Sequence, residues 1–212
     1  MHTTLSRLPL YALLVFVGVG LVGCDSDPAS DDGFPDPETV LVEDLAADPF
    51  VGVDDIGRPV GTGAFTFYSL RENSEVPSSD SASTAWDVAF RGTTILVNGG
   101  ASGPGAGAAQ VMEGVFEEMT EAPAGGWQQD SDTGLAIPAS SGQGWYNYNP
   151  DAMVVTPIPG RVLLIRTADG RYAKIRILSY YKGSPETPTF ESEARYYTFE
   201  YVFQPDGSRS LQ

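Results

Sequence analysis

Short apolar segments recur along the chain, and Gly or Pro separates them about every dozen residues, a spacing typical of all-β proteins. The segments are rich in aromatic and β-branched residues, which favour strands. They read AFTFYSL, TAWDVAF, TTILV, MVVTPI, RVLLIR, YAKIRILSYY and YYTFEYVF. This pattern predicts an all-β fold with a single antiparallel domain. Only residues 38–48 and 110–122 have apolar spacings that would also suit a helix.

The clearest local unit is a hairpin over residues 161–181. Two strand-like runs flank Asp169 and Gly170, and Asp-Gly is a preferred turn pair between antiparallel strands. We therefore expect the runs RVLLIR and YAKIRILSYY to pair with each other.

Side chains alternate across a strand, so the second arm of this hairpin has two different faces. Ile175 and Ile177 fall on one face, which predicts a core, and Lys174 and Arg176 fall on the other, which predicts a solvent-facing surface. Glu200, in the last strand, is a candidate to pair with Lys174 or Arg176. The last strand alternates in the same way, and the aromatic residues on its core face are Tyr197, Phe199, Tyr201 and Phe203.

Residues 98–109 read NGGASGPGAGAA, and glycine-rich turns of this kind can surround phosphate groups. Known phosphate-binding loops lead into a helix, and the P-loop adds a Lys before Ser or Thr. No Lys lies in this stretch, and the short segment after it is not a convincing helix. It is therefore predicted to be a flexible surface connection, whose backbone amides can still line a ligand pocket.

The first 23 residues have the pattern of a lipoprotein signal peptide. Arg7 precedes an apolar run from Leu8 to Val22, and the ending LVGC matches the bacterial lipobox. The cysteine of a lipobox receives a diacylglycerol thioether after export. A membrane-spanning helix is the alternative, but the run is shorter than the roughly 20 residues that a span prefers. We expect cleavage before Cys24, which would carry the lipid anchor.

The segment after Cys24 is strongly acidic. Residues 24–55 contain 11 Asp and Glu but no Lys or Arg. Its front part is rich in Pro, Ser and Asp and cannot bury enough apolar surface to become ordered. We predict a disordered acidic tether over residues 24–39 and a folded domain over residues 40–212. The acidic run serves either as a plain spacer or as a sorting signal toward the cell surface.

Composition excludes several classes of site and partner. The only histidine is His2 and the only cysteine is Cys24, so the processed chain has no imidazole and no free thiol. This excludes Ser-His-Asp and Cys-His catalysis, disulfides and zinc sites with Cys or His ligands. A net charge of -16 argues against a nucleic-acid partner. A carboxylate pair for glycoside hydrolysis stays open, but nothing places two carboxylates together, and we expect a protein that is not an enzyme.

Three long stretches carry a family resemblance. They are TAWDVAFRGTTILVNGGASGPG, GWYNYNPDAMVVTPIPGRVLLIRTADGRYAKIRILSYY and YYTFEYVFQPDGS. Together they resemble the HmuY family of haem-binding lipoproteins, over about Phe67 to Arg209. The resemblance implies an all-β fold, a lipid anchor at the outer membrane, and capture of haem (iron protoporphyrin IX) for transfer to a TonB-dependent receptor. The cell-surface and periplasmic faces of the membrane both stay open.

The resemblance also implies where haem iron would be held, because members of the family use two axial side chains, both His or both Met. The first position lies just after WYNY, at Met153. The second follows the ILSYY strand, where the sequence reads YYKGSPETPTF and offers neither His nor Met. Three alternatives stay open: ligation by Tyr180, Tyr181 or Lys182, five-coordinate iron, or loss of haem binding.

Nearby rings and cations complete the expected pocket. The candidates to cover the porphyrin faces or to pair with its propionates are Trp145, Tyr146, Tyr148, Arg161 and Lys182. Met112 and Met119 are further candidate thioethers. Met153 has one competing role, which is to fill an irregular gap in the core.

A second class of function also stays open. The same β scaffold would suit a surface lipoprotein that binds no haem, such as an adhesin or a glycan-binding accessory protein with exposed Trp and Tyr. The missing second axial ligand weakens the haem hypothesis without supporting this alternative.

Overall fold

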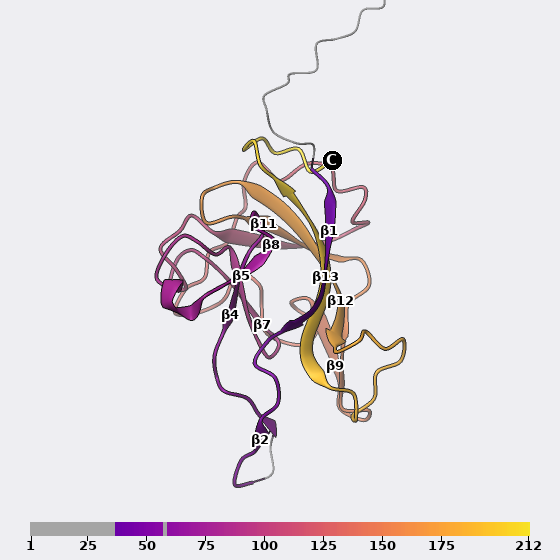
Figure 1. Ribbon diagram of the computed structural model, residues 1–212. Helices are drawn as coiled ribbons and strands as arrows, with labels where there is room; N and C mark the ends of the chain where they lie inside the picture. Colours follow the sequence, from indigo (N-terminus) through magenta and orange to yellow (C-terminus); the bar gives the residue numbers. More distant parts are fainter. Residues whose placement is uncertain (1–36, 57–58) are drawn as a thin grey trace, which may run out of the picture. The chain divides into compact units, whose positions relative to one another are not determined.

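Two antiparallel sheets contain most of the strands (Figure 1). The computed structural model describes residues 37–56 and 59–212. The larger sheet has the order β1-β13-β12-β11-β8. Its strands are β1 (Thr39–Ala46), β8 (Ala108–Glu113), β11 (Arg161–Arg166), β12 (Tyr172–Tyr181) and β13 (Ala194–Gln204). The second sheet, in the order β5-β4-β6-β7, contains β4 (Thr66–Ser69), β5 (Ser74–Val76), β6 (Val88–Arg91) and β7 (Thr94–Val97).

Two small hairpins and one short helical turn complete the architecture. The hairpins are β2 (Gly52–Val53) with β3 (Pro59–Val60), and β9 (Tyr146–Asn149) with β10 (Val154–Pro157). A 3-10 turn, η1 (Ser78–Asp80), is the single helical element of the described residues. The predicted all-β, antiparallel fold is thus confirmed.

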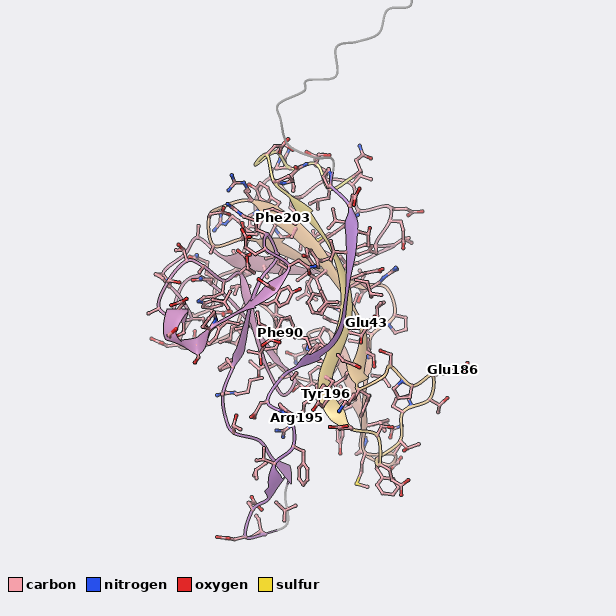
Figure 2. All side chains as sticks on the ribbon, viewed as in Figure 1. Glu43, Phe90, Glu186, Arg195, Tyr196 and Phe203 are labelled. Atoms are coloured by element: carbon pink, nitrogen blue, oxygen red, sulfur yellow. The ribbon has the colours of Figure 1, made fainter. Side chains whose placement is uncertain are left out.

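The core lies between the two sheets and is unusually aromatic. The ring of Phe90 on β6 lies 4.9 Å from that of Tyr197 and 5.5 Å from that of Phe199, both on β13. Tyr68 on β4 reaches Phe199 from the same side, at 5.7 Å. Figure 2 labels Phe90 among the side chains that fill this space. The core face predicted for the last strand is confirmed, since Tyr197, Phe199 and Tyr201 are buried and Phe203 is partly buried against the same core.

The hairpin predicted over residues 161–181 is formed by β11 and β12. Leu163 pairs with Ile175 across the two strands. The connecting turn closes through the backbone N–H of Thr167, which donates to the carbonyl of Arg171 at 2.8 Å. Gly170 has a φ of 86°, a left-handed conformation that glycine adopts without a steric penalty.

The second face of β12 was predicted to be solvent-facing, and this is wrong for Lys174. Only 3% of Lys174 is exposed, because the segment after β8 crosses over this face. Its ammonium donates to the carbonyls of Phe116 and Met119, at 2.9 and 3.0 Å. A second hydrophobic cluster lies here, made of Phe116, Ala122, Val162, Leu164, Val202 and Leu211. The predicted pairing of Glu200 is confirmed with Arg176, which lies directly opposite it.

The two segments whose spacing would also suit a helix each begin with a strand in the structure. Residues 38–48 contain β1, which pairs with β13, and residues 110–122 continue β8, which pairs with β11 and then leads into turns. Neither forms an α-helix because a long partner strand satisfies its backbone hydrogen bonds, and this tertiary pairing outweighs local spacing.

The glycine-rich stretch is a surface connection over residues 100–106, as predicted, but its two ends are packed tightly against each other. The backbone N–H of Gly107 donates to the carbonyl of Asn98 at 2.8 Å. A Cβ added at Gly99 would lie 2.0 Å from the Gly107 carbonyl oxygen, and one added at Gly107 would lie 2.4 Å from that of Asn98. The glycines are required because two backbone segments touch.

The predicted signal peptide, Cys24 and nearly all of the predicted tether lie outside the described residues. Within residues 37–56 and 59–212, no helix is both long enough and apolar enough to cross a membrane.

Candidate functional site

The hairpin of β9 and β10 carries Met153 at its tip. Asn149 pairs with Val154 where the two strands meet the turn, and the Asn149 side-chain oxygen accepts the backbone N–H groups of Asp151 at 3.0 Å and Ala152 at 3.2 Å. This Asx turn is one that the sequence signal Asn-Pro-Asp favours. The turn therefore has a defined shape, although sequence reasoning had not singled out Asn149.

Met153 closes the turn in a strained conformation and is open to solvent. Its φ is 56°, which is uncommon for a residue with a side chain, and 58% of it is exposed. Core filling, the competing role for Met153, is therefore wrong. All seven residues from 147 to 153 are exposed, so the thioether lies in an accessible tip of the hairpin.

The base of the same hairpin rests on aromatic residues. Trp145 lies 5.0 Å from Tyr146, 5.7 Å from Tyr180 and 5.1 Å from Tyr197. The indole N–H of Trp145 donates to the carbonyl of Thr93 at 3.0 Å. These rings fix the hairpin to the main core.

Most of the predicted pocket rings belong to this base. Trp145, Tyr146, Tyr180 and Tyr181 are at most 8% exposed, so contact with a flat ligand would require them to move. Tyr148, by contrast, is 47% exposed on β9 and lies opposite Val155. Directly paired residues share a face of a hairpin, so Tyr148 and Val155 form one surface beside the tip.

The proposed substitute ligands at the end of β12 and directly after it are engaged in other contacts. The hydroxyl of Tyr181 accepts the backbone N–H of Val155 at 2.9 Å, which joins β12 to β10. Burial raises the pKa of Tyr180 and of Tyr181, so both are neutral phenols at physiological pH. Lys182 pairs with Glu193 at 3.2 Å, and this hydrogen-bonded carboxylate raises the pKa of the ammonium. Iron ligands must be deprotonated, so these groups are poor donors as they stand.

Arg161 lies on β11, beside the edge strand β8 of the larger sheet. It pairs with Glu113 at 3.3 Å, directly opposite it on β8. In the part of the chain that the structure describes, its Nε atom is the one buried side-chain nitrogen or oxygen without a hydrogen-bond partner. The structure joins Arg161 to β8, whereas it brings Met153, Tyr148 and Tyr181 together at the β9–β10 hairpin.

A shallow groove of about 390 Å³ lies beside the loop between β12 and β13, and sequence reasoning missed it. Phe50, Phe190 and residues 191–195 line it. Figure 2 labels Arg195 and Tyr196 at this end of β13. Phe190 is an exposed ring within a Pro-rich polar loop, and that isolated ring was the available sequence signal.

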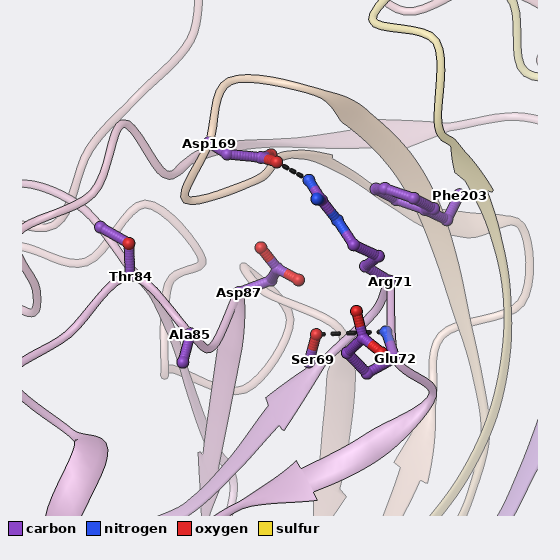
Figure 3. A pocket seen from close by; sticks show the side chains of 8 residues that line it. All are labelled: Ser69, Arg71, Glu72, Thr84, Ala85, Asp87, Asp169 and Phe203. Atoms are coloured by element: carbon purple, nitrogen blue, oxygen red, sulfur yellow. Dashed lines mark hydrogen bonds and ion pairs between the residues drawn. The ribbon is translucent and has the colours of Figure 1, made fainter.

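A second recess, of about 350 Å³, is lined by Arg71, Asp87 and Asp169, each of which has a partner within the chain (Figure 3). Arg71 forms an ion pair with Asp169 across the opening. The carboxylate of Asp87 accepts the backbone N–H groups of Leu70 at 2.9 Å and of Ala168 at 3.0 Å. Burial raises the pKa of Asp87, against the effect of these hydrogen bonds. In this recess, the turn between β4 and β5 therefore meets the turn between β11 and β12.

Metal coordination by clustered acids is not supported by the geometry. Within residues 37–56 and 59–212, no group of three His, Cys, Asp or Glu side chains is placed to hold a metal ion. Among the methionines of the described residues, Met153 is the most exposed, at 58% against 37% for Met112.

The fold and this site define an all-β scaffold that presents a solvent-exposed hairpin. The family model described as HmuY protein matches residues 62–201, more than half of the chain, and the chain therefore belongs to the HmuY family. HmuY proteins are haem-binding proteins.

Solved structures with a similar fold include the apo HmuY analog TFO of Tannerella forsythia, with 17% identity, coverage of 80% of this chain and 96% of that chain, and a TM-score of 0.44. Apo PinO, from Porphyromonas gingivitis, is 15% identical, with coverage of 81% and 99% and a TM-score of 0.45. No curated protein matches the chain.

Proposed function

We propose that this protein is a haem-binding lipoprotein that captures haem at the outer membrane and passes it to a TonB-dependent receptor for iron acquisition. Membership of the HmuY family supports the ligand class. The observation that carries the proposal is the exposed thioether of Met153, held in a shaped turn where the family resemblance expects an axial ligand.

The donor set fits an iron porphyrin on one side. A thioether is a soft, neutral axial ligand, and relative to imidazole it favours ferrous iron. Met153 would supply this ligand, and the exposed ring of Tyr148 would cover part of the porphyrin. Lys182, which is half exposed, would be a candidate cation for a propionate, provided that Glu193 releases it. Trp145 and Tyr146 would support the hairpin from below.

A haemin titration tests this assignment. The chain from residue 25 onward contains every described strand, and it is titrated with and without dithionite while the Soret band is followed. We expect a Soret shift, larger under reducing conditions, and a loss of affinity of roughly tenfold or more in Met153→Ala, as expected for about 1.4 kcal/mol of lost binding free energy. Met112→Ala is the matched control, since Met112 is 37% exposed and lies on β8.

Absence of a Soret shift in both redox states would contradict haem binding. The protein would then be better described as a surface lipoprotein without haem, such as an adhesin or a glycan-binding accessory protein.

The lipid anchor is proposed separately, at Cys24. Cys24→Ser removes the thiol that receives the diacylglycerol group, so the protein should leave the membrane fraction. The assay is fractionation of cells that express either form, and retention of the variant in membranes would show that residues 1–23 remain as an uncleaved span.

A further inference from the structure

The hairpin site offers one axial ligand, although a haem iron has two axial positions. Outside His2 and Cys24, the sequence has no imidazole or thiol. The methionines of the described residues are Met112, Met119 and Met153. Met112 lies on β8 and Met119 packs against the second hydrophobic cluster, so neither belongs to the β9–β10 hairpin.

The loop that should contribute the second ligand contains no soft donor. Residues 183–193 read GSPETPTFESE, without sulfur or imidazole. At its start, the phenol of Tyr181 is buried and bound to Val155, and the ammonium of Lys182 is paired with Glu193. The loop itself is tied to β1, because the backbone N–H of Gly183 donates to the Asp44 carboxylate at 2.8 Å. A second ligand from this loop would require several of these contacts to break.

The tip that carries Met153 is suited to contact from outside the chain. Its seven consecutive residues 147–153 are all exposed, and Met153 itself is 58% exposed. The Asn149 side chain shapes the turn, and Tyr148 adds an exposed ring on the hairpin. A ligand lying against this tip would therefore keep its opposite face open to solvent.

We infer that two copies of this chain hold one haem between them, with Met153 of each copy on opposite faces of the porphyrin. This inference rests on the proposed function. One copy presents an incomplete site, and the second copy supplies the missing thioether from the same exposed turn. The expected stoichiometry is one haem for two chains.

Charge makes this assembly sensitive to salt. Each full chain has a net charge of -16, so two copies repel each other. Salt screens charges beyond about 8 Å at physiological ionic strength, and an interface with few opposite charges gains from that screening. The two-chain complex should therefore become tighter when salt is raised from about 0.05 to 0.5 M.

Sedimentation velocity with detection at the Soret wavelength tests the inference on the reduced chain from residue 25 onward. We expect the mass of the haem-bearing species to be twice that of one chain while haem is limiting, and the titration to end near half a haem per chain. Because a bridging ligand in excess saturates each copy separately, the dimer should dissociate again when haem exceeds chain. Met153→Ala should abolish both the dimer and its six-coordinate spectrum, whereas Met112→Ala should keep both.

The outcomes separate this inference from the proposed function. A Soret shift with one haem on a single chain at every ratio would overturn the inference and leave haem binding intact. A haem-induced dimer that persists in Met153→Ala would also overturn it, since contact through porphyrin faces alone would then suffice. Absence of any Soret shift would instead contradict the proposed function.

Discussion

The two lysines of the chain allow a matched test of what the buried one does. Lys174 holds the segment after β8 against the outer face of the larger sheet through the carbonyls of Phe116 and Met119. Its ammonium also lies 4.7 Å from the centre of the Phe116 ring. Lys174→Met keeps the length of the side chain but removes the charge and both hydrogen bonds.

The expected loss of stability follows from these two contacts. Hydrogen bonds to charged groups contribute about 1.5 to 3 kcal/mol each, so the pair is worth roughly 3 to 6 kcal/mol. Burial of the ammonium is unfavourable, and it lowers the pKa of Lys174 in the native state. Lys174→Met removes this unfavourable burial, which offsets part of the loss. We therefore expect a net loss near the lower end, about 3 kcal/mol in the free energy of unfolding.

Urea denaturation followed by tryptophan fluorescence measures this difference. With an m-value of about 2 kcal/mol/M, the midpoint should fall by about 1.5 M. Lys182→Met is the control, because Lys182 is 51% exposed and its surface ion pair with Glu193 should contribute less than about 1 kcal/mol. If the two variants lose the same stability within about 0.5 kcal/mol, the buried ammonium does not hold the segment and the reasoning is refuted.

Two further predictions concern the packed loop and the buried tyrosines. Gly107→Ala should destabilise the protein by about 2 kcal/mol or more, because the new Cβ would lie 2.4 Å from the Asn98 carbonyl oxygen. Gly134→Ala is the control and should change the denaturation midpoint little, because its new Cβ would meet no atom within 4 Å. Equal midpoints for the two variants would contradict the close packing. Burial raises the pKa of Tyr68 to about 12, and it raises the pKa of Tyr197 and Tyr201 as well. The unfolded chain therefore loses these protons first, and stability should fall as pH rises above about 10. The part of the absorbance change at 295 nm that comes from the buried tyrosines should accompany the loss of circular dichroism, and full tyrosine ionisation with the fold intact would refute the assignment.

Local patterning was enough to predict most strands of the core, although not β1 and β8. Alternation placed Tyr197, Phe199 and Tyr201 on one face of β13, and all three are buried in the structure. Asp169 and Gly170 predicted the turn of the β11–β12 hairpin. These predictions succeed because alternation and turn chemistry depend on neighbours in sequence.

Family resemblance predicted where to look for the site without deciding its geometry. It directed attention to Met153, and the structure added that this side chain is exposed in a left-handed turn. It also directed attention to Trp145 and Tyr180, which the structure places in the buried base of the hairpin. A ring beside a turn looks the same in sequence whether it faces solvent or the core.

The sequence by itself determined where most strands lie, how their faces alternate, and the absence of imidazole and thiol from the folded part. Only the tertiary structure decided which faces are covered: Lys174 is buried because a distant segment crosses it, and β1 is a strand because β13 lies beside it. The physical reason is that burial and strand pairing depend on segments far apart in the chain, whereas periodicity records only the nearest neighbours.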